Sequence, residues 1–188
     1  MLVANQSIVT TSVIIRLREL LFGYSVLCRN ILGEAAGGDV GRPTTHLHFY
    51  FHENFSGGPD GTAVQVSAAR GGLNNGSFFG GVVNVVDDML REGADLASRL
   101  LGRAQGLTVG AFLTDGELLT VCDFVFTDGP YNGSTLALLG RALLGTVMER
   151  PIFGGTGAFR MARGYTLSKM VASPDPNRML VLGYDAYI

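Results

Sequence analysis

The stretch Thr45–Glu53 alternates between two kinds of side chain. One face of an extended chain would carry apolar groups and a single carboxyl group, those of Leu47, Phe49, Phe51 and Glu53. The opposite face would carry polar rings, those of His46, His48, Tyr50 and His52. This period of two predicts a half-buried β-strand whose polar rings point outward.

Further strand-like segments follow at short intervals. They are Thr62–Ala69, Phe79–Asp87, Leu100–Leu113, Leu118–Thr127, Ser134–Leu144, Ala158–Val171 and Met179–Ile188. Turn-forming clusters separate several of them, such as Ser56–Gly61, Asp115-Gly116 and Asp128–Gly133. The Leu- and Ala-rich segments Asp95–Leu101 and Leu136–Leu144 also suit a helix. Gly140 and Gly145 favour a strand for the second of these.

The predicted strands are joined mostly by short turns and lack crossovers of helix length, so we expect antiparallel pairing. Antiparallel strands can hide both edges of a sheet by closing it into a barrel. An eight-stranded barrel is wide enough to be filled by side chains or to hold one small ligand. We therefore predict an all-β fold, an eight-stranded antiparallel up-and-down β-barrel. An eight-stranded sandwich is the alternative.

The composition agrees with a folded β domain. Apolar residues make up 47% of the 188 residues, and 27 glycines accompany 11 phenylalanines, which suits short strands and tight turns. The formal net charge of −2 argues against nucleic acid or an anionic membrane as a partner. We assign residues 42–188 to one β-barrel domain.

Residues 1–41 have a different character. Met1–Ile15 lacks charge but is diluted by polar residues, and Arg16, Arg18 and Glu19 interrupt the chain before Leu20–Cys28. Neither apolar stretch is long enough to span a bilayer. The order of charge and hydrophobicity also differs from that of a standard signal peptide. We expect an atypical leader or a disordered N-terminal segment.

Four asparagines occur in Asn-x-Ser/Thr sequences, namely Asn5, Asn54, Asn75 and Asn132. These are glycan acceptors if the chain enters the secretory pathway, and ordinary turn residues otherwise. We expect secretion, with Asn54, Asn75 and Asn132 as the glycosylation sites within the barrel domain.

No metal site is expected from the histidines. His48 and His52 would be roughly 13 Å apart on one strand, which is too far for both to bind one zinc ion. His46 and His48 could share a metal, but the chain has no histidine outside this strand that could complete the site. Gly154–Gly157 lacks the Lys-Ser/Thr of a phosphate loop, so a bulge or tight bend is expected there. Cys122 is expected to be a buried free thiol, with a Cys28–Cys122 disulfide as the alternative.

Glu53 is the candidate catalytic residue. If its face lines the barrel interior, burial among apolar side chains would raise the pKa of its carboxyl group and make it a proton donor. The alternative places Glu53 in solvent at the rim. The other charged residues in apolar strands suggest structural ion pairs, although Arg160 could meet an interior carboxylate. These are Asp87, Asp88, Asp123, Arg160 and Arg163.

Several short strings occur together in one order. They are Leu47–His52, Thr62–Val66, Gly102–Gly106, Phe124–Phe126, Tyr131–Thr135, Gly154–Gly157 and Ala162–Tyr165. In content and spacing they resemble the plant dirigent proteins, and the resemblance covers residues 45–188. It implies a barrel of the dirigent or allene-oxide-cyclase type that forms a homo-oligomer, a dimer or a trimer, and is secreted to the apoplast and glycosylated.

The resemblance also implies a function. Dirigent proteins bind phenoxy radicals or quinone methides derived from monolignols and set the stereochemistry of their coupling in lignan or lignin biosynthesis. An external oxidase or laccase makes the radicals, so neither a redox centre nor a cofactor is expected here. Some relatives cyclise a quinone methide with acidic pocket residues. Two alternatives therefore remain: such a cyclase, and a barrel that binds carbohydrate or a defence-related ligand.

The chain departs from the lignan-forming members at four polar positions. Glu53 replaces an Asp, Thr108 a Tyr, Ala142 an Asp and Met148 an Arg, although Arg150 is near. We therefore expect a more apolar pocket without a pair of catalytic carboxylates. Besides Glu53, the residues predicted to contact a ligand are Phe49, Phe51, Leu107, Thr108, Ala142, Met148, Phe153 and Arg160.

Overall fold

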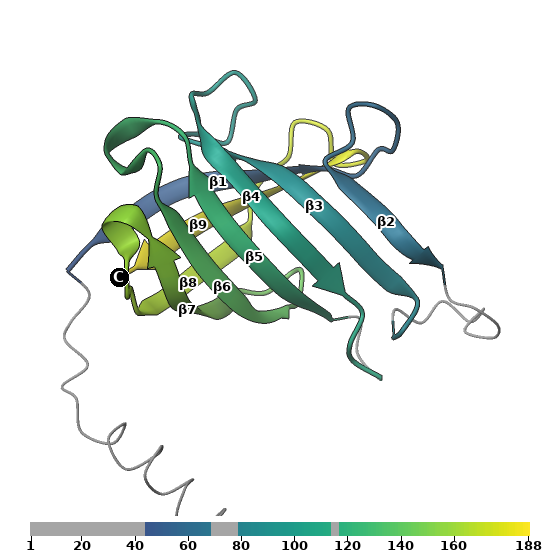
Figure 1. Ribbon diagram of the computed structural model, residues 1–188. Coiled ribbons are helices and arrows are strands. Elements are labelled where there is room, and N and C mark those ends of the chain that lie inside the picture. The colour runs from purple at the N-terminus through teal and green to yellow at the C-terminus, as the bar shows by residue number, and fades with distance from the viewer. Residues whose placement is uncertain (1–43, 69–78, 114–116) are drawn as a thin grey trace, which may run out of the picture. The chain divides into compact units, whose positions relative to one another are not determined.

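The computed structural model describes residues 44–68, 79–113 and 117–188 (Figure 1). Its strands are β1 (His46–Asn54), β2 (Ala63–Ala68), β3 (Val82–Arg91), β4 (Leu100–Val109), β5 (Leu118–Phe126), β6 (Thr135–Ala142), β7 (Met148–Thr156), β8 (Gly164–Met170) and β9 (Met179–Tyr187). Two short 3-10 turns, η1 (Gly129–Tyr131) and η2 (Gly157–Phe159), complete it. The predicted leader, residues 1–41, lies outside the described residues.

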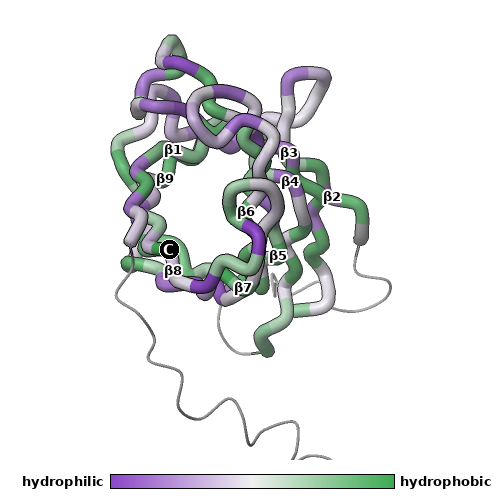
Figure 2. The backbone as a smooth tube through the Cα atoms, turned by 60° about the vertical axis from the view of Figure 1, so that its left-hand side comes forward, coloured by the Kyte–Doolittle hydropathy of each residue, from purple (hydrophilic) through white to green (hydrophobic). Residues whose placement is uncertain are grey.

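The strands close into an antiparallel barrel. The sheet runs in the order β1-β9-β8-β7-β6-β5-β4-β3, and β1 also pairs with β3, which closes the ring (Figure 2). The short strand β2 pairs with the part of β3 that β1 leaves free, from Ala63 opposite Val86 onward. The predicted eight-stranded barrel is thus confirmed, and the sandwich is not formed. No helix of the described residues is long and apolar enough to cross a membrane.

One strand of the ring was missed by the sequence pattern. We predicted a single strand over Ala158–Val171, whereas β8 begins only at Gly164, and β7 was not predicted. Pro151 and the two glycines at positions 154 and 155 hide the alternation in β7, because proline and glycine usually mark a break in a strand. The register also shifts between Ala137 and Leu138 on β6, so a β-bulge further disturbs the period.

The interior is filled by aromatic rings. Phe49, Phe124 and Tyr184 meet at the centre, with ring centroids 5.2 to 5.6 Å apart. Phe126, Tyr131 and Phe159 pack together where β5 ends. Residues near the opposite ends of the strands, such as Leu118, Ala142 and Leu180, line a cavity instead. The barrel is therefore plugged at one end and hollow at the other.

The three histidines of β1 have different surroundings. His46 and His48 are half-exposed, as expected, and both lie 2.9 Å from the same Asp185 oxygen, Oδ1. His52 is fully buried, and its Nε2 lies 3.0 Å from the carbonyl oxygen of Gly93. The expectation that His52 points to solvent is wrong, because the loop between β3 and β4 contacts that side of β1. Among the described residues no group of three or more metal-binding side chains is placed to hold an ion.

Candidate functional site

The cavity lies at the end of the barrel where β5 and β7 begin. Its space, including the open mouth, amounts to about 660 Å³. Much of its wall is apolar, formed by residues such as Phe51, Val86, Phe124, Met148, Leu180 and Leu182. The polar groups that interrupt this wall include Glu53, Asp88, Asn84, Thr108, Arg150 and Tyr184. A mainly apolar cavity with a few convergent polar groups is typical of a small-molecule site.

Two carboxyl groups share one side of the cavity. The pairing of β1 with β3 ends at His52 and Met89, and Glu53 and Asp88 are the neighbouring residues beyond this pair on their strands. Asp88 is fully buried. Burial, and then the charge of Glu53, raise the pKa of Asp88 to about 8, while burial raises the pKa of Glu53. The pair therefore retains a proton at neutral pH.

A cationic group and a phenol lie on β7 and β9. Arg150 is buried, and its Nη2 donates hydrogen bonds to Ser168 Oγ at 2.8 Å and to the Tyr184 hydroxyl group. The guanidinium carbon of Arg150 also lies 5.2 Å from the Tyr184 ring centroid. None of the ion pairs among the described residues involves Arg150. This positive charge is thus available to a ligand.

Gly140 makes room for Arg150. A Cβ atom added at Gly140 would lie 2.8 Å from Cγ of Arg150 and 3.3 Å from its Cβ. Both atoms belong to the stem of the side chain, which cannot move away without moving the guanidinium group. The glycine therefore permits Arg150 to lie against the β6 wall.

Cys122 also lines the cavity, but its thiol group is expected to be unreactive. It is a free, buried thiol, as predicted. Burial, and secondarily the charge of Asp88, raise its pKa to about 12. Because the thiolate is the reactive form of cysteine, we expect Cys122 to contribute volume rather than nucleophilic chemistry.

A second hollow adjoins the cavity beneath the β1–β2 loop. It is lined by residues such as Phe55, Gly58, Gly61 and Ala63, and it shares Glu53 and Asn84 with the main cavity. Its space, including the open side, is about 870 Å³. Glu53 is half-buried and lies at the boundary between the two hollows.

Five of the predicted site residues line the main cavity: Phe51, Glu53, Thr108, Ala142 and Met148. Phe49 lies deeper, in the aromatic core against Phe124 and Tyr184. Thr108 Oγ1 accepts a hydrogen bond of 3.0 Å from Asn84 Nδ2. The structure thus brings these residues together, and their contact with a ligand remains a prediction.

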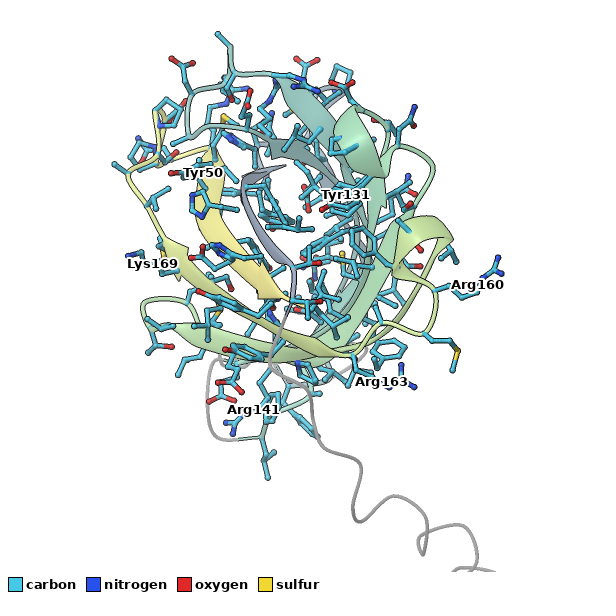
Figure 3. All side chains as sticks on the ribbon, turned by 90° about the vertical axis from the view of Figure 1, so that its left-hand side faces the viewer. Tyr50, Tyr131, Arg141, Arg160, Arg163 and Lys169 are labelled. Carbon is cyan, nitrogen blue, oxygen red and sulfur yellow. The ribbon has the colours of Figure 1, made fainter. Side chains whose placement is uncertain are left out.

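Besides Phe49, three predicted contact residues do not line this cavity. The side chains of Leu107 and Phe153 are 42% and 50% exposed, because each neighbours an inward-facing residue, Thr108 or Ile152, and successive side chains of a strand point to opposite faces. Arg160 follows η2 and extends away from the barrel (Figure 3). We therefore correct the predicted wall by removing these residues.

The sequence prediction overlooked three cavity residues. Asp88 was expected to form a structural ion pair, but it is Asp87 that pairs with Arg103. The predicted strand ended at Asp87, although the alternation of Val86, Asp88 and Leu90 on one face carries β3 further. That alternation was the available signal for Asp88. Arg150 lay in the unpredicted β7, and Tyr184 lay in a predicted strand without being singled out.

The predicted glycosylation sites differ in accessibility. Asn132 is exposed and caps η1. The side chain of Asn54 is occupied, because its Nδ2 donates to the carbonyl oxygen of Asp60 and its Oδ1 accepts from Ser56. Asn75 lies outside the described residues.

Comparison with known proteins agrees with this geometry. The family model of the dirigent-like proteins matches residues 44–188. Dirigent protein 1 of Arabidopsis thaliana is 44% identical over 145 residues, which is 77% of this chain and 74% of the relative. Pterocarpan synthase 1 of Glycyrrhiza echinata is 39% identical over 146 residues, 77% of either chain. The solved structure of the pterocarpan synthase dirigent protein GePTS1 superposes with a TM-score of 0.67, at 39% identity, over 76% of this chain and 82% of that chain.

Proposed function

Because this chain belongs to the dirigent-like family, we propose that its cavity binds phenolic radicals or quinone methides derived from monolignols and fixes the stereochemistry of the product. An external oxidase or laccase supplies the radicals. The observation that carries the proposal is the pair of carboxyl groups, buried Asp88 and half-buried Glu53, in a largely apolar cavity. Such a cavity suits an aromatic ligand that must exchange protons without meeting bulk water.

The coupling step itself requires only orientation. Each radical has already lost one electron and one proton to the oxidase, and two radicals join by pairing their unpaired electrons in a new carbon–carbon bond. The apolar wall, including Phe51 and Leu182, holds an aromatic ring by shape. Restricting the approach geometry favours one product, because competing orientations are excluded.

The quinone methide that results then requires a proton donor and an acceptor. A hydroxyl oxygen adds to the benzylic carbon and forms a carbon–oxygen bond, while the carbonyl oxygen becomes a phenol. Asp88 donates the proton to that oxygen, and the Glu53 carboxylate accepts the proton of the attacking hydroxyl group. A proton then returns from Glu53 to Asp88, so the step is an isomerisation without net oxidation.

Arg150 and Tyr184 give the ligand its orientation. The phenolate character that develops on the carbonyl oxygen of a reacting quinone methide is stabilised by nearby positive charge. Arg150 carries such a charge, and none of the ion pairs among the described residues joins it to a carboxylate. Its hydrogen bonds to Ser168 and Tyr184 hold the guanidinium group in place.

A second candidate is a cyclase that acts on a preformed substrate without any oxidase. The raised pKa of Asp88 favours it, because a carboxyl group that stays protonated near neutral pH is suited to acid catalysis. The 39% identity to proteins named pterocarpan synthase also supports it. Both candidates use the same carboxyl pair, and they differ in whether radical coupling precedes the closure.

The test is oxidative coupling of coniferyl alcohol with an added oxidase, followed by chiral chromatography. An enantiomeric excess that depends on the protein, and that is lost in Glu53→Gln, supports the first function. Conversion of a preformed quinone methide without oxidase, combined with racemic coupling, supports the cyclase. A racemic product and no conversion contradict both, and binding on a glycan array would then favour the carbohydrate alternative.

We also propose that the barrel self-associates after secretion. The residues in register across the outer face of β2 to β6 form one row, namely Val64, Val85, Leu107, Val121 and Leu139. Each of these apolar side chains is at least 39% exposed. A contiguous apolar row on a sheet face suits a second copy of the chain. Leu107→Lys should shift the protein toward monomer in analytical ultracentrifugation, and an unchanged mass would contradict this interface.

A further inference from the structure

Thr62 connects the β1–β2 loop to the buried carboxyl group of Asp88. Its Oγ1 accepts a hydrogen bond of 2.8 Å from the backbone nitrogen of Asn54. The same hydroxyl group donates a hydrogen bond to Asp88 Oδ1. The backbone of Thr62 is also held on both sides, because its nitrogen donates to Asn54 O and its oxygen accepts from Asp87 N, both at 2.9 Å. Thr62 is therefore fixed in position relative to Asp88.

The hydrogen-bond inventory defines the direction of the Thr62–Asp88 bond. A threonine hydroxyl group has one proton to donate. The Asn54 N–H group can only donate, so Thr62 must accept there and is free to donate its own proton elsewhere. Asp88 Oδ1 is the acceptor that the described residues provide for that proton. Oδ1 is thereby the accepting oxygen of the carboxyl group.

The other oxygen of Asp88 is unpartnered. Asp88 Oδ2 is buried and has no hydrogen-bond partner among the described residues, and Asp88 lines the cavity. A buried polar atom without a partner costs free energy, which a ligand can recover by accepting a hydrogen bond there. Oδ1 thus accepts the hydrogen bond from Thr62, whereas Oδ2 is the oxygen that can form a hydrogen bond with the ligand.

The charged groups around Asp88 favour its neutral form. Burial opposes ionisation most strongly, and the charges of Glu53 on β1 and Asp87 on β3 oppose it as well, whereas Thr62 and Arg103 on β4 favour it. Cys122 on β5 is also near, since the Asp88 charge raises the pKa of that thiol. With the pKa of Asp88 raised to about 8, the carboxyl group is protonated at neutral pH.

We propose that Thr62 is a positioning residue that holds the acidic proton of Asp88 on Oδ2, directed at the ligand, and thereby makes Asp88 the proton donor and Glu53 the acceptor. The inference rests on the proposed function, in which the acceptor is the carbonyl oxygen of a quinone methide. It assigns distinct roles to the two carboxyl groups, whereas in a symmetric pair either group could be the donor or the acceptor.

Thr62→Val tests this assignment because valine has the shape of threonine without the hydroxyl group. Asp88 Oδ1 loses its donor, so the proton is no longer confined to Oδ2 and the pKa of Asp88 rises further. Thr62→Ser is the matched control, since it keeps the hydroxyl group. Thr62→Ala repeats the loss of the hydroxyl group if Thr62→Val fails to fold.

The activity readout is the addition of water, in place of the attacking hydroxyl group, to the preformed para-quinone methide of eugenol, followed against pH. The rate of the wild type should fall above about pH 8, where Asp88 loses its proton. Thr62→Val should lower kcat about tenfold, leave KM within about twofold, and move this alkaline limb to higher pH. Thr62→Ser should keep the wild-type limb. A Thr62→Val enzyme with wild-type kcat and limb would overturn the proposal.

An infrared readout separates this inference from the proposed function. The C=O stretching band of protonated Asp88 can be assigned by its loss in Asp88→Asn. In Thr62→Val the band should move to higher frequency, because the carbonyl oxygen loses a hydrogen bond, whereas Thr62→Ser should keep it. If the band moves but no variant consumes the probe, the proposed function fails and the role of Thr62 stands. An unmoved band in Thr62→Val and Thr62→Ala overturns that role whatever the activity.

Discussion

Glu53 and Asp88 lie next to the last cross-strand pair of β1 and β3, and both line the same cavity. Two carboxyl groups this close cannot both ionise freely in an apolar setting. The charge of Glu53 accordingly contributes to the raised pKa of Asp88. Strand register, rather than any local motif, creates this acidic pair.

The pair makes the stability of the protein depend on pH. The pKa of Asp88 is raised from 3.8 to about 8, so the folded state holds a proton that the unfolded state releases. Stability is therefore greatest at low pH for this group and is lost as the pH rises toward 8, by up to about 1.4 kcal/mol per pH unit. Glu53 shifts in the same direction.

Urea unfolding between pH 6.5 and about 8 measures this loss. His52, whose pKa is lowered from 6.5 mainly by burial, raises stability as the unfolded chain loses its proton in the lower part of this window, and this contribution cancels when wild type and Asp88→Asn are compared at each pH. Asp128 and Asp185, with lowered pKa values, are ionised in both states there. Asp88→Asn should flatten the decline, and an unchanged slope in this variant would show that Asp88 is ionised in the folded protein.

Gly140→Ala should displace Arg150. The added Cβ would lie 2.8 Å from Arg150 Cγ, and overpacking of this kind typically costs about 1–3 kcal/mol. The free energy of unfolding should fall by that amount, and the product selectivity should fall with it. Gly154→Ala on β7 is the control, since nothing lies within 4 Å of its added Cβ. Equal effects of the two substitutions would contradict the role of Gly140.

Tyr184→Phe should destabilise the protein while preserving its aromatic core. The ring stacks on Phe49 at 5.6 Å, and phenylalanine keeps this contact. Arg150 Nη2 loses one of its two acceptors, which costs about 1–3 kcal/mol for a buried charged group. Thermal unfolding should show this loss.

Tyr187→Phe is the matched control on the same strand. Tyr187 stacks on His46 and Tyr165 at the partly exposed outer surface, so the change should remain within about 0.5 kcal/mol. Similar losses in the two variants would mean that the Arg150–Tyr184 hydrogen bond contributes nothing.

Cys122 should resist thiol reagents in the folded protein. It is 5% exposed, and its pKa is raised to about 12, so thiolate is scarce and inaccessible. In a Cys28→Ser variant, iodoacetamide at about pH 8 should leave the folded chain unmodified and alkylate Cys122 after denaturation. Mass spectrometry measures the difference. Rapid alkylation of the folded chain would contradict the buried position of the thiol.

The alternation in β1 predicted correctly which residues enter the barrel. Phe49 and Phe51 face inward, because one polar and one apolar side suffice to orient a strand of this kind. Glu53, for which the sequence left the interior and the rim open, lines the cavity. The same argument failed for His52, since its burial depends on the loop around Gly93, which is far away in sequence. Tertiary contacts of that sort leave no local pattern.

The cavity was harder to predict than the barrel. Leu107 and Thr108 were both assigned to its wall, although neighbours on one strand cannot both face inward. The predicted absence of a carboxylate pair followed from Ala142, and Asp88 on another strand supplies the second carboxyl group. Arg150 likewise lines the cavity and supplies a cation there, although Met148 replaces the arginine found in the lignan-forming members. Side chains from different strands can fill one place in a barrel, and only the register shows which do.

The most direct test of the cavity chemistry is the enantiomeric excess of the ring-closed product formed from a preformed, prochiral quinone methide without oxidase. Wild-type protein should accelerate closure and give one enantiomer in excess. Asp88→Asn should fold, because asparagine is nearly isosteric, yet give racemic product at the uncatalysed rate. An undiminished excess in Asp88→Asn would contradict the acidic role of the carboxyl pair.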